Sequence, residues 1–179
     1  MTASAKIIGL VPIGKIPRDV LKVIAAHITG YLNLKTEILP PLKHPSYACD
    51  LRRLQYDAGI ILSTLESMPF HDHDKVIGVL DVDLFIPVFT HVFGEARQGG
   101  KHALVSLYRL GSPPSIRKKL SPCILERAAK VALHELGHLF NRVHCEDSNC
   151  IMHFTGLVED LDKIPPYFCP YCAAALPPI

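Results

Sequence analysis

The sequence has no long uninterrupted apolar run and no cluster of basic residues. No stretch approaches the eighteen or so consecutive apolar residues that a bilayer-crossing helix needs, and the apolar run at 7–13 is broken by Gly9 and Pro12, as in a first strand rather than a signal peptide. The 19 Lys and Arg residues are scattered and leave a net charge of +2. We therefore expect a cytoplasmic protein with no nucleic-acid or membrane partner.

Glycine-rich phosphate loops, internal repeats and low-complexity tracts are also absent. Asp81 and Asp83 lie two residues apart on a predicted strand, but without a phosphate loop we interpret them as strand-end residues rather than as a magnesium site. The segment from His71 to Asp74 alternates histidine and aspartate, and we interpret it as a solvated loop rather than as a metal site.

The periodicity of apolar residues predicts alternating strands and helices in one domain that spans residues 1–179. We expect strands at 6–13, 36–39 and 75–85, helices at 17–33 and 49–65, and a loop at 110–120. Two β segments, 88–94 and 103–108, are separated by polar turn residues and can form a hairpin at the sheet edge. The order indicates a mixed sheet with helical backing, an α/β (α+β) fold.

A third long helix is predicted to begin with Ser121 as its cap and Pro122 in the first helical position. It carries the pattern His134-Glu135-x-x-His138. Residues four apart share one face of a helix, so the two imidazoles can reach one metal ion. Glu135 lies about 100 degrees around the helix, where its carboxylate can reach a water on that ion and act as a general base.

The third histidine, His144, lies six residues after His138, and a continuous helix would place the two on nearly opposite sides. The chain must therefore turn sharply after a helix end at 139 or 140. Asn141 is placed to make this turn, because asparagine tolerates positive φ better than most non-glycine residues. Together with His134, the histidines leave one tetrahedral position open, which is the arrangement of a catalytic zinc.

The six cysteines divide into a group of four and an isolated pair, Cys49 and Cys123, which we predict to be buried thiols. The group of four consists of Cys145, Cys150, Cys169 and Cys172. Two loop sulfurs and a Cys-x-x-Cys knuckle make a closed site typical of structural zinc. Disulfides are one alternative, which a reducing compartment disfavours. A redox switch in the knuckle is another.

Cys145 directly follows the predicted ligand His144. A structural zinc would therefore anchor the backbone that carries the third catalytic ligand, and would stabilise a tail that is poor in core-forming pattern. We expect two Zn²⁺ ions per chain, one catalytic and one structural.

Residues 134–172 resemble the metzincin clan of zinc peptidases and, more closely, the archaemetzincin family. The resemblance rests on His-Glu-x-x-His with a third histidine, on a cysteine directly after it, and on Cys-x-Met and Cys-x-x-Cys further on. It implies a metzincin-like zincin fold: a mixed twisted β-sheet with a backing helix and an active-site helix in an upper subdomain (about 1–140), and a small zinc-stabilised C-terminal subdomain (about 141–179).

The resemblance also implies an activity and roles for individual residues. It implies a zinc-dependent peptidase acting on peptide or protein substrates, with Glu135 as general base, Met152 as an apolar floor beneath the metal, and an edge strand at 88–94 that pairs with substrate. We expect the protein to be a monomer. Asn141 replaces the usual glycine of the turn. Phe154 stands where some branches place a metal-reaching tyrosine. The alternative function is a non-catalytic, zinc-stabilised peptide-binding module whose cleft is blocked.

Overall fold

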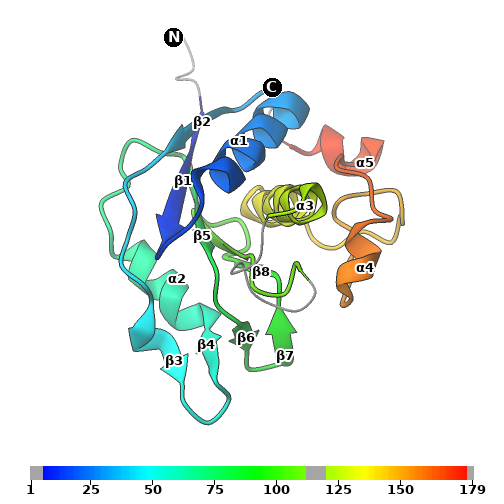
Figure 1. Cartoon of the computed structure of the whole chain (residues 1–179). Helices are drawn as coiled ribbons and strands as arrows, with labels where there is room; N and C mark the ends of the chain where they lie inside the picture. Colours follow the sequence, from blue (N-terminus) through cyan, green and yellow to red (C-terminus); the bar gives the residue numbers. More distant parts are fainter. Residues whose placement is uncertain (1–5, 112–119, 177–179) are drawn as a thin grey trace.

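A five-stranded mixed sheet lies at the centre of the computed structural model, which describes residues 6–111 and 120–176 (Figure 1). Its strands in spatial order are β2 (Lys35–Ile38), β1 (Ile7–Ile13), β5 (Lys75–Leu80), β9 (His102–Ser106) and β8 (Gly94–Ala96). The first four strands are parallel, and β8 runs antiparallel to β9 at the edge. The central strands are buried along nearly their whole length, which explains their continuous apolar sequences.

Helices cover both faces of this sheet. α1 (Arg18–Leu32) and α3 (Pro122–Leu139) lie on one face, and α2 (Ala58–Glu66) lies on the other (Figure 1). The predicted first helix is confirmed, since the buried residues of α1 recur at helical spacing: Val20, Leu21, Ile24, Ile28 and Leu32.

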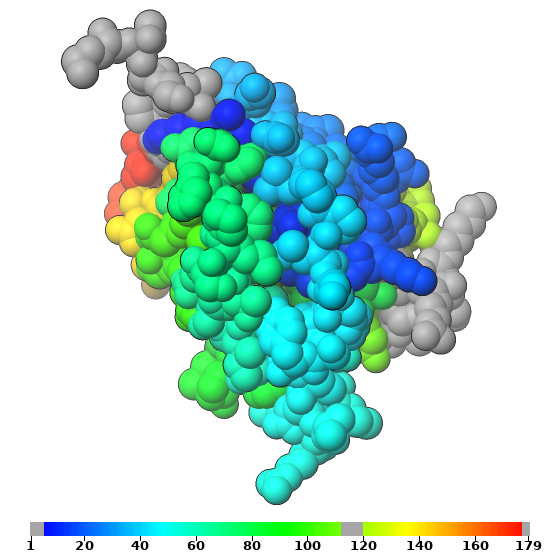
Figure 2. Space-filling view, turned by 90° about the vertical axis from the view of Figure 1, so that its left-hand side faces the viewer, coloured from blue at the N-terminus to red at the C-terminus, as the bar shows by residue number. Residues whose placement is uncertain are grey.

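The first half of the predicted helix 49–65 instead forms two strands of a second, four-stranded sheet. A short 3₁₀ helix (Ser46–Ala48) precedes it, and its strands are β3 (Cys49–Asp50), β4 (Gln55–Asp57), β6 (Leu84–Ile86) and β7 (Phe89–Val92). The β3–β4 hairpin extends from the body of the molecule (Figure 2). Leu51 and Leu54, which suggested the helix, are 80% and 76% exposed, and Leu54 has a positive φ of 54°.

The helix itself begins later because Asp57 caps it: the Asp57 side chain accepts a hydrogen bond from the Ile60 N–H at 3.2 Å. The predicted strand 75–85 is likewise divided, because β5 ends at Leu80 and the chain crosses to the second sheet as β6.

The predicted hairpin is confirmed only in part. In the structure a hairpin forms between β8 and β9, which the 97–101 turn joins. Most of the predicted strand 88–94 instead forms β7, which pairs with β6. Most of the predicted loop 110–120 lies outside the described residues. Within the described part of the chain, no helix is long and apolar enough to cross a membrane.

The start and end of α3 agree with the sequence-based prediction. The Ser121 side chain accepts a hydrogen bond from the Ile124 N–H at 3.3 Å, and Pro122 occupies the first turn. The helix ends at Leu139, and Asn141 has a φ of 64°. After this turn, the described residues up to 176 form two short helices, α4 (Val158–Leu161) and α5 (Pro170–Ala174).

The C-terminal part shares its core with the rest of the chain. Apolar residues that follow α3 join the same buried cluster as α1, α3 and the central strands: Ile151, Met152, Leu161, Ile164 and Phe168. Met152 is fully buried against Gly137 of α3, where an added Cβ would overlap the methionine sulfur and lie 2.9 Å from Phe168 Cε1. Glycine in the last turn of this helix therefore makes room for the segment beneath it.

We predict that Gly137→Ala destabilises the protein by about 1–3 kcal/mol, because overpacking outweighs the gain in helix propensity. Gly30→Ala in α1 is the matched control, since no atom lies within 4 Å of a Cβ added there. That control should raise stability by roughly 0.5–1 kcal/mol. Urea unfolding of both variants checks the prediction, and equal stabilisation of the two would contradict it.

Candidate active site and metal centres

Three histidine side chains converge where α3 ends. His134 and His138 lie one helical turn apart, and the turn at Asn141 brings His144 back to them. One ring nitrogen from each histidine lies within 4.8 Å of the others. The Nε2 atoms of His134 and His138 are 3.1 Å apart. The structure thus brings together the three residues that the spacing pointed to.

Backbone carbonyl groups orient two of these rings. His134 Nδ1 lies 2.7 Å from the Ile151 oxygen, and His138 Nδ1 lies 2.7 Å from the Arg142 oxygen. Because a carbonyl oxygen only accepts hydrogen bonds, each Nδ1 carries the proton and each Nε2 keeps its lone pair.

This arrangement fits a metal ion. Two Nε2 lone pairs that face each other at 3.1 Å repel unless a cation lies between them. Their separation is close to the roughly 3.3 Å expected between two nitrogen ligands of a tetrahedral zinc.

Burial keeps the histidines neutral. It lowers the pKa of His134 to about 3 and also lowers the pKa values of His138 and His144. A neutral imidazole is the form that binds metal, so protons compete little for these nitrogens near neutral pH.

Glu135 lies beside this group under the edge strand β8. The Glu135 side chain is buried, and a Cβ added at Gly94 would lie 2.6 Å from its Oε1 atom. Burial, with a smaller contribution from the charge of Glu95, raises the pKa of Glu135 well above its ordinary value. A divalent cation at the histidines would lower that pKa again, because an opposite charge favours the carboxylate.

A cleft with a volume of about 530 Å³ runs past Glu135 and the three histidines. One wall comes from β7 and β8, so the edge strand is not the single segment 88–94 but two short strands in two sheets. Phe154 also lines the cleft, and its ring stacks on Phe89 of β7 with centroids 5.9 Å apart and lies 5.0 Å from the His144 ring. The chain after Met152 therefore lines the cleft.

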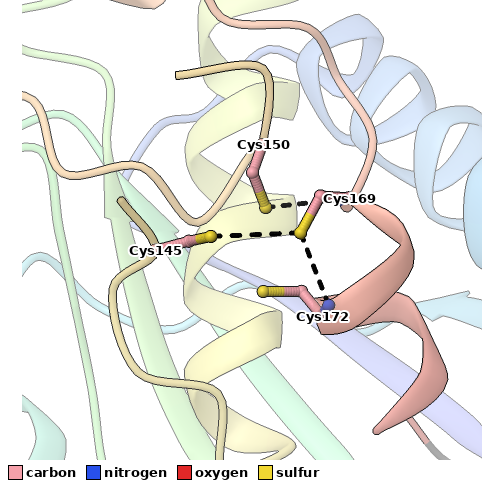
Figure 3. Close-up of side chains that lie close together, drawn as sticks. All are labelled: Cys145, Cys150, Cys169 and Cys172. Carbon is pink, nitrogen blue, oxygen red and sulfur yellow. Dashed lines mark hydrogen bonds between the residues drawn. The ribbon is translucent and has the colours of Figure 1, made fainter. Parts of the chain in front are cut away.

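The four grouped cysteines converge in a second site (Figure 3). Cys145 and Cys150 come from the loop after α3, and the other two from the start of α5. All four sulfurs lie within 4.8 Å of one another. The Cys145 and Cys169 sulfurs are 3.9 Å apart, far longer than a disulfide bond of about 2.05 Å. The distance is close to the roughly 3.8 Å between two sulfur ligands of a tetrahedral zinc.

Backbone N–H groups also point at these sulfurs. The Cys169 N–H donates to Cys150 Sγ at 3.3 Å, and the Cys172 N–H donates to Cys169 Sγ at 3.5 Å. The second of these bonds lowers the pKa of Cys169, whereas burial raises the pKa values of Cys150 and Cys172. Donors of this kind favour thiolate, the form of cysteine that binds metal.

The two sites share one short segment of backbone, residues 150–153. Cys150 contributes its sulfur to the cysteine group, and Ile151 contributes the carbonyl that orients His134. The Met152 carbonyl accepts a hydrogen bond from the Cys145 N–H at 2.9 Å, and His153 Nδ1 donates to the Cys145 carbonyl at 3.0 Å. Because both sites use this backbone segment, holding it in place at one site also holds it in place at the other.

Several other sequence interpretations are tested by the structure. The prediction that Cys123 is buried is wrong, because it lies exposed in the first turn of α3, and Cys49 is only half-buried. Asp83 forms a bidentate ion pair with Arg109, both contacts at 2.6 Å, which agrees with a strand-end role. His73 lies 3.1 Å from the Glu37 carboxylate.

The sequence did not reveal the residues that shape the site through a backbone carbonyl or through the lack of a side chain. The carbonyls of Ile151 and Arg142, and the absence of a side chain at Gly94, shape the site as strongly as the histidines do. No residue-type signal marks a carbonyl group, so only a residue's place in the fold could have identified them.

The fold and the converging histidines define a zinc-dependent peptidase. A solved zinc-dependent peptidase from Methanocorpusculum labreanum superposes with a TM-score of 0.82 at 26% identity, covering 95% of this chain and 100% of that one. The archaemetzincin structure from Methanopyrus kandleri gives a TM-score of 0.83 at 34% identity, with 97% and 94% covered.

Sequence comparison identifies the family within this class. Peptidase family M54 matches residues 15–177. The archaemetzincin of Methanocaldococcus jannaschii is 34% identical over 170 residues, which cover 92% of this chain and 89% of that protein. The chain therefore belongs to the archaemetzincin family, peptidase family M54.

We predict that Asn141→Ala destabilises the protein by about 1 kcal/mol, because alanine tolerates the left-handed φ of 64° less well than asparagine. Asn141→Gly is the matched variant and should stay within about 0.5 kcal/mol of the parent, since glycine adopts this conformation freely. Thermal unfolding of the two variants separates the effects. If they lost the same stability, backbone strain would not be the cause.

Proposed function

We propose that His134, His138 and His144 bind the catalytic zinc and that Glu135 is the general base in peptide-bond hydrolysis. The observation that carries this proposal is the pair of opposed Nε2 lone pairs beside a buried carboxylate in a cleft of about 530 Å³. Met152, buried beneath α3, would form the apolar floor of the site.

The three histidines would hold a zinc ion, which would supply Lewis-acid chemistry at a substrate carbonyl and lower the pKa of water to roughly 7. Glu135 accepts the proton from the attacking water and delivers it to the leaving amine. Gly94 lies against this carboxylate and leaves no side chain that would displace it.

A peptide substrate can pair with the free edge of β8. Among the described residues β8 pairs with β9 alone, so its other edge can donate and accept backbone hydrogen bonds with an extended peptide. A non-catalytic binding module with a blocked cleft is the alternative. The open volume next to Glu135 favours the peptidase mechanism over it.

We further propose that the four cysteines hold a second, structural zinc, giving two Zn²⁺ per chain. The closed set of four sulfurs supports this assignment, because it has the composition and spacing of structural zinc sites. The core shared between the sheet and the residues after 140 supports a single catalytic domain with an upper part at about 1–140 and a lower part at about 141–179.

Glu135→Gln should lower kcat by about a hundredfold to ten-thousandfold while both zinc ions remain bound, because the amide cannot accept the proton. A peptide library incubated with and without chelator first identifies a cleaved sequence, on which the variant is then assayed. Elemental analysis reports the retained metal. Undiminished cleavage by the variant would rule out Glu135 as the base.

Cys172→Ser should bind one zinc instead of two and should also weaken metal binding at the histidines, because residues 150–153 serve both sites. Cys123→Ser is the matched control, since this exposed thiol lies outside both metal-binding groups. Metal content after dialysis against increasing chelator measures both effects. Two zinc ions in Cys172→Ser would remove the cysteine site from this proposal.

A further inference from the structure

The turn between β8 and β9 lies against the end of the active-site helix, although some forty residues separate the two in sequence. The Gly99 N–H donates to the His138 backbone carbonyl at 2.8 Å. The Gln98 side-chain amide donates to Asn141 Oδ1 at 3.3 Å and to the Arg142 backbone carbonyl at 3.1 Å. The edge hairpin and the metal-binding turn are thus joined by three hydrogen bonds.

One of these acceptors also serves a metal-binding histidine. The Arg142 carbonyl that Gln98 contacts is the same oxygen that accepts the Nδ1–H of His138 at 2.7 Å. A carbonyl oxygen has two lone pairs and can accept both donors at once. Gln98 therefore helps to set the direction of the carbonyl that sets the direction of the ring.

The carbonyl lies in a segment that needs such support. Asn141, Val143, His144 and residues 146–149 are exposed, and Arg142 and Cys145 are only partly buried. Few buried contacts therefore restrain the backbone between the end of α3 and the cysteine group. A side-chain hydrogen bond from Gln98 in the β8–β9 turn is one of the contacts that does.

We propose that Gln98 is a positioning residue for His138, acting through the Arg142 carbonyl. The inference rests on the proposed role of His138 as a zinc ligand and extends it to a residue in the β8–β9 turn. Gln98 also lines the cleft, and it lies two residues after the end of β8, the strand proposed to bind substrate. One side chain therefore links the edge hairpin to a zinc ligand.

The test uses three variants of the full chain with different donors at position 98. Gln98→Glu has the same size but no N–H donor, and Gln98→Leu removes all hydrogen bonding. Gln98→Lys keeps a donor of similar reach and serves as the rescue. Chelator competition measures zinc affinity at the histidine site and at the cysteine site of the same molecule, which makes the cysteine site an internal control.

We expect the Glu and Leu variants to bind zinc at the histidine site about threefold to tenfold more weakly, the range that one hydrogen bond of ordinary strength supplies. Affinity at the cysteine site should stay unchanged, and Gln98→Lys should remain within about twofold of the parent. With saturating zinc, elemental analysis of the Glu and Leu variants should find the histidine site as fully loaded as in the parent.

Three results would overturn the inference. Unchanged zinc affinity in Gln98→Glu would show that the contact does not orient the ligand. Equal weakening at both zinc sites would indicate a general loss of folding. A raised KM with unchanged zinc affinity would make Gln98 a substrate-binding residue instead. If the parent bound no zinc at the histidines, the proposed function itself would fail, and this inference with it.

Discussion

Two hydrogen bonds from imidazole to backbone decide what the active site can bind. His134 and His138 each donate Nδ1–H to a carbonyl oxygen at 2.7 Å, which directs both Nε2 lone pairs into one small space. A protonated ring would repel its neighbour there, and burial lowers the pKa of both histidines. The site is therefore arranged for a cation before any cation arrives, as expected when outer partners orient metal ligands.

The two carbonyls belong to different parts of the fold. Arg142 lies in the turn after α3, which the β8–β9 turn contacts through Gln98 and Gly99. Ile151 lies next to Cys150, in the segment that the cysteine group holds. The β8–β9 turn thus supports the His138 ring, and the cysteine group supports the His134 ring. Damage far from the histidines should consequently change the direction of a ring through whichever carbonyl it displaces.

Two glycines, Gly94 and Gly137, allow neighbouring elements to pack closely around the site. Gly94 lets the edge strand lie directly against Glu135, and the burial of this carboxyl group raises its pKa. Gly137 lets the Met152 side chain pack directly against the helix that carries the histidines. In both places a single methyl group would push apart elements that carry the chemistry, which connects packing density to function.

The sequence by itself determined the features that depend on neighbours within one or two helical turns. The cap at Ser121, the left-handed turn at Asn141, and the spacing of the histidine and cysteine groups follow local rules, and the structure agrees with them. It misled at residues 49–57 and 88–94, and at the exposed Cys123, because strand pairing and burial depend on distant partners. Only the tertiary structure decided which carbonyls orient the histidines and which glycine contacts Glu135, since backbone groups are alike in every residue and differ only in where the fold places them.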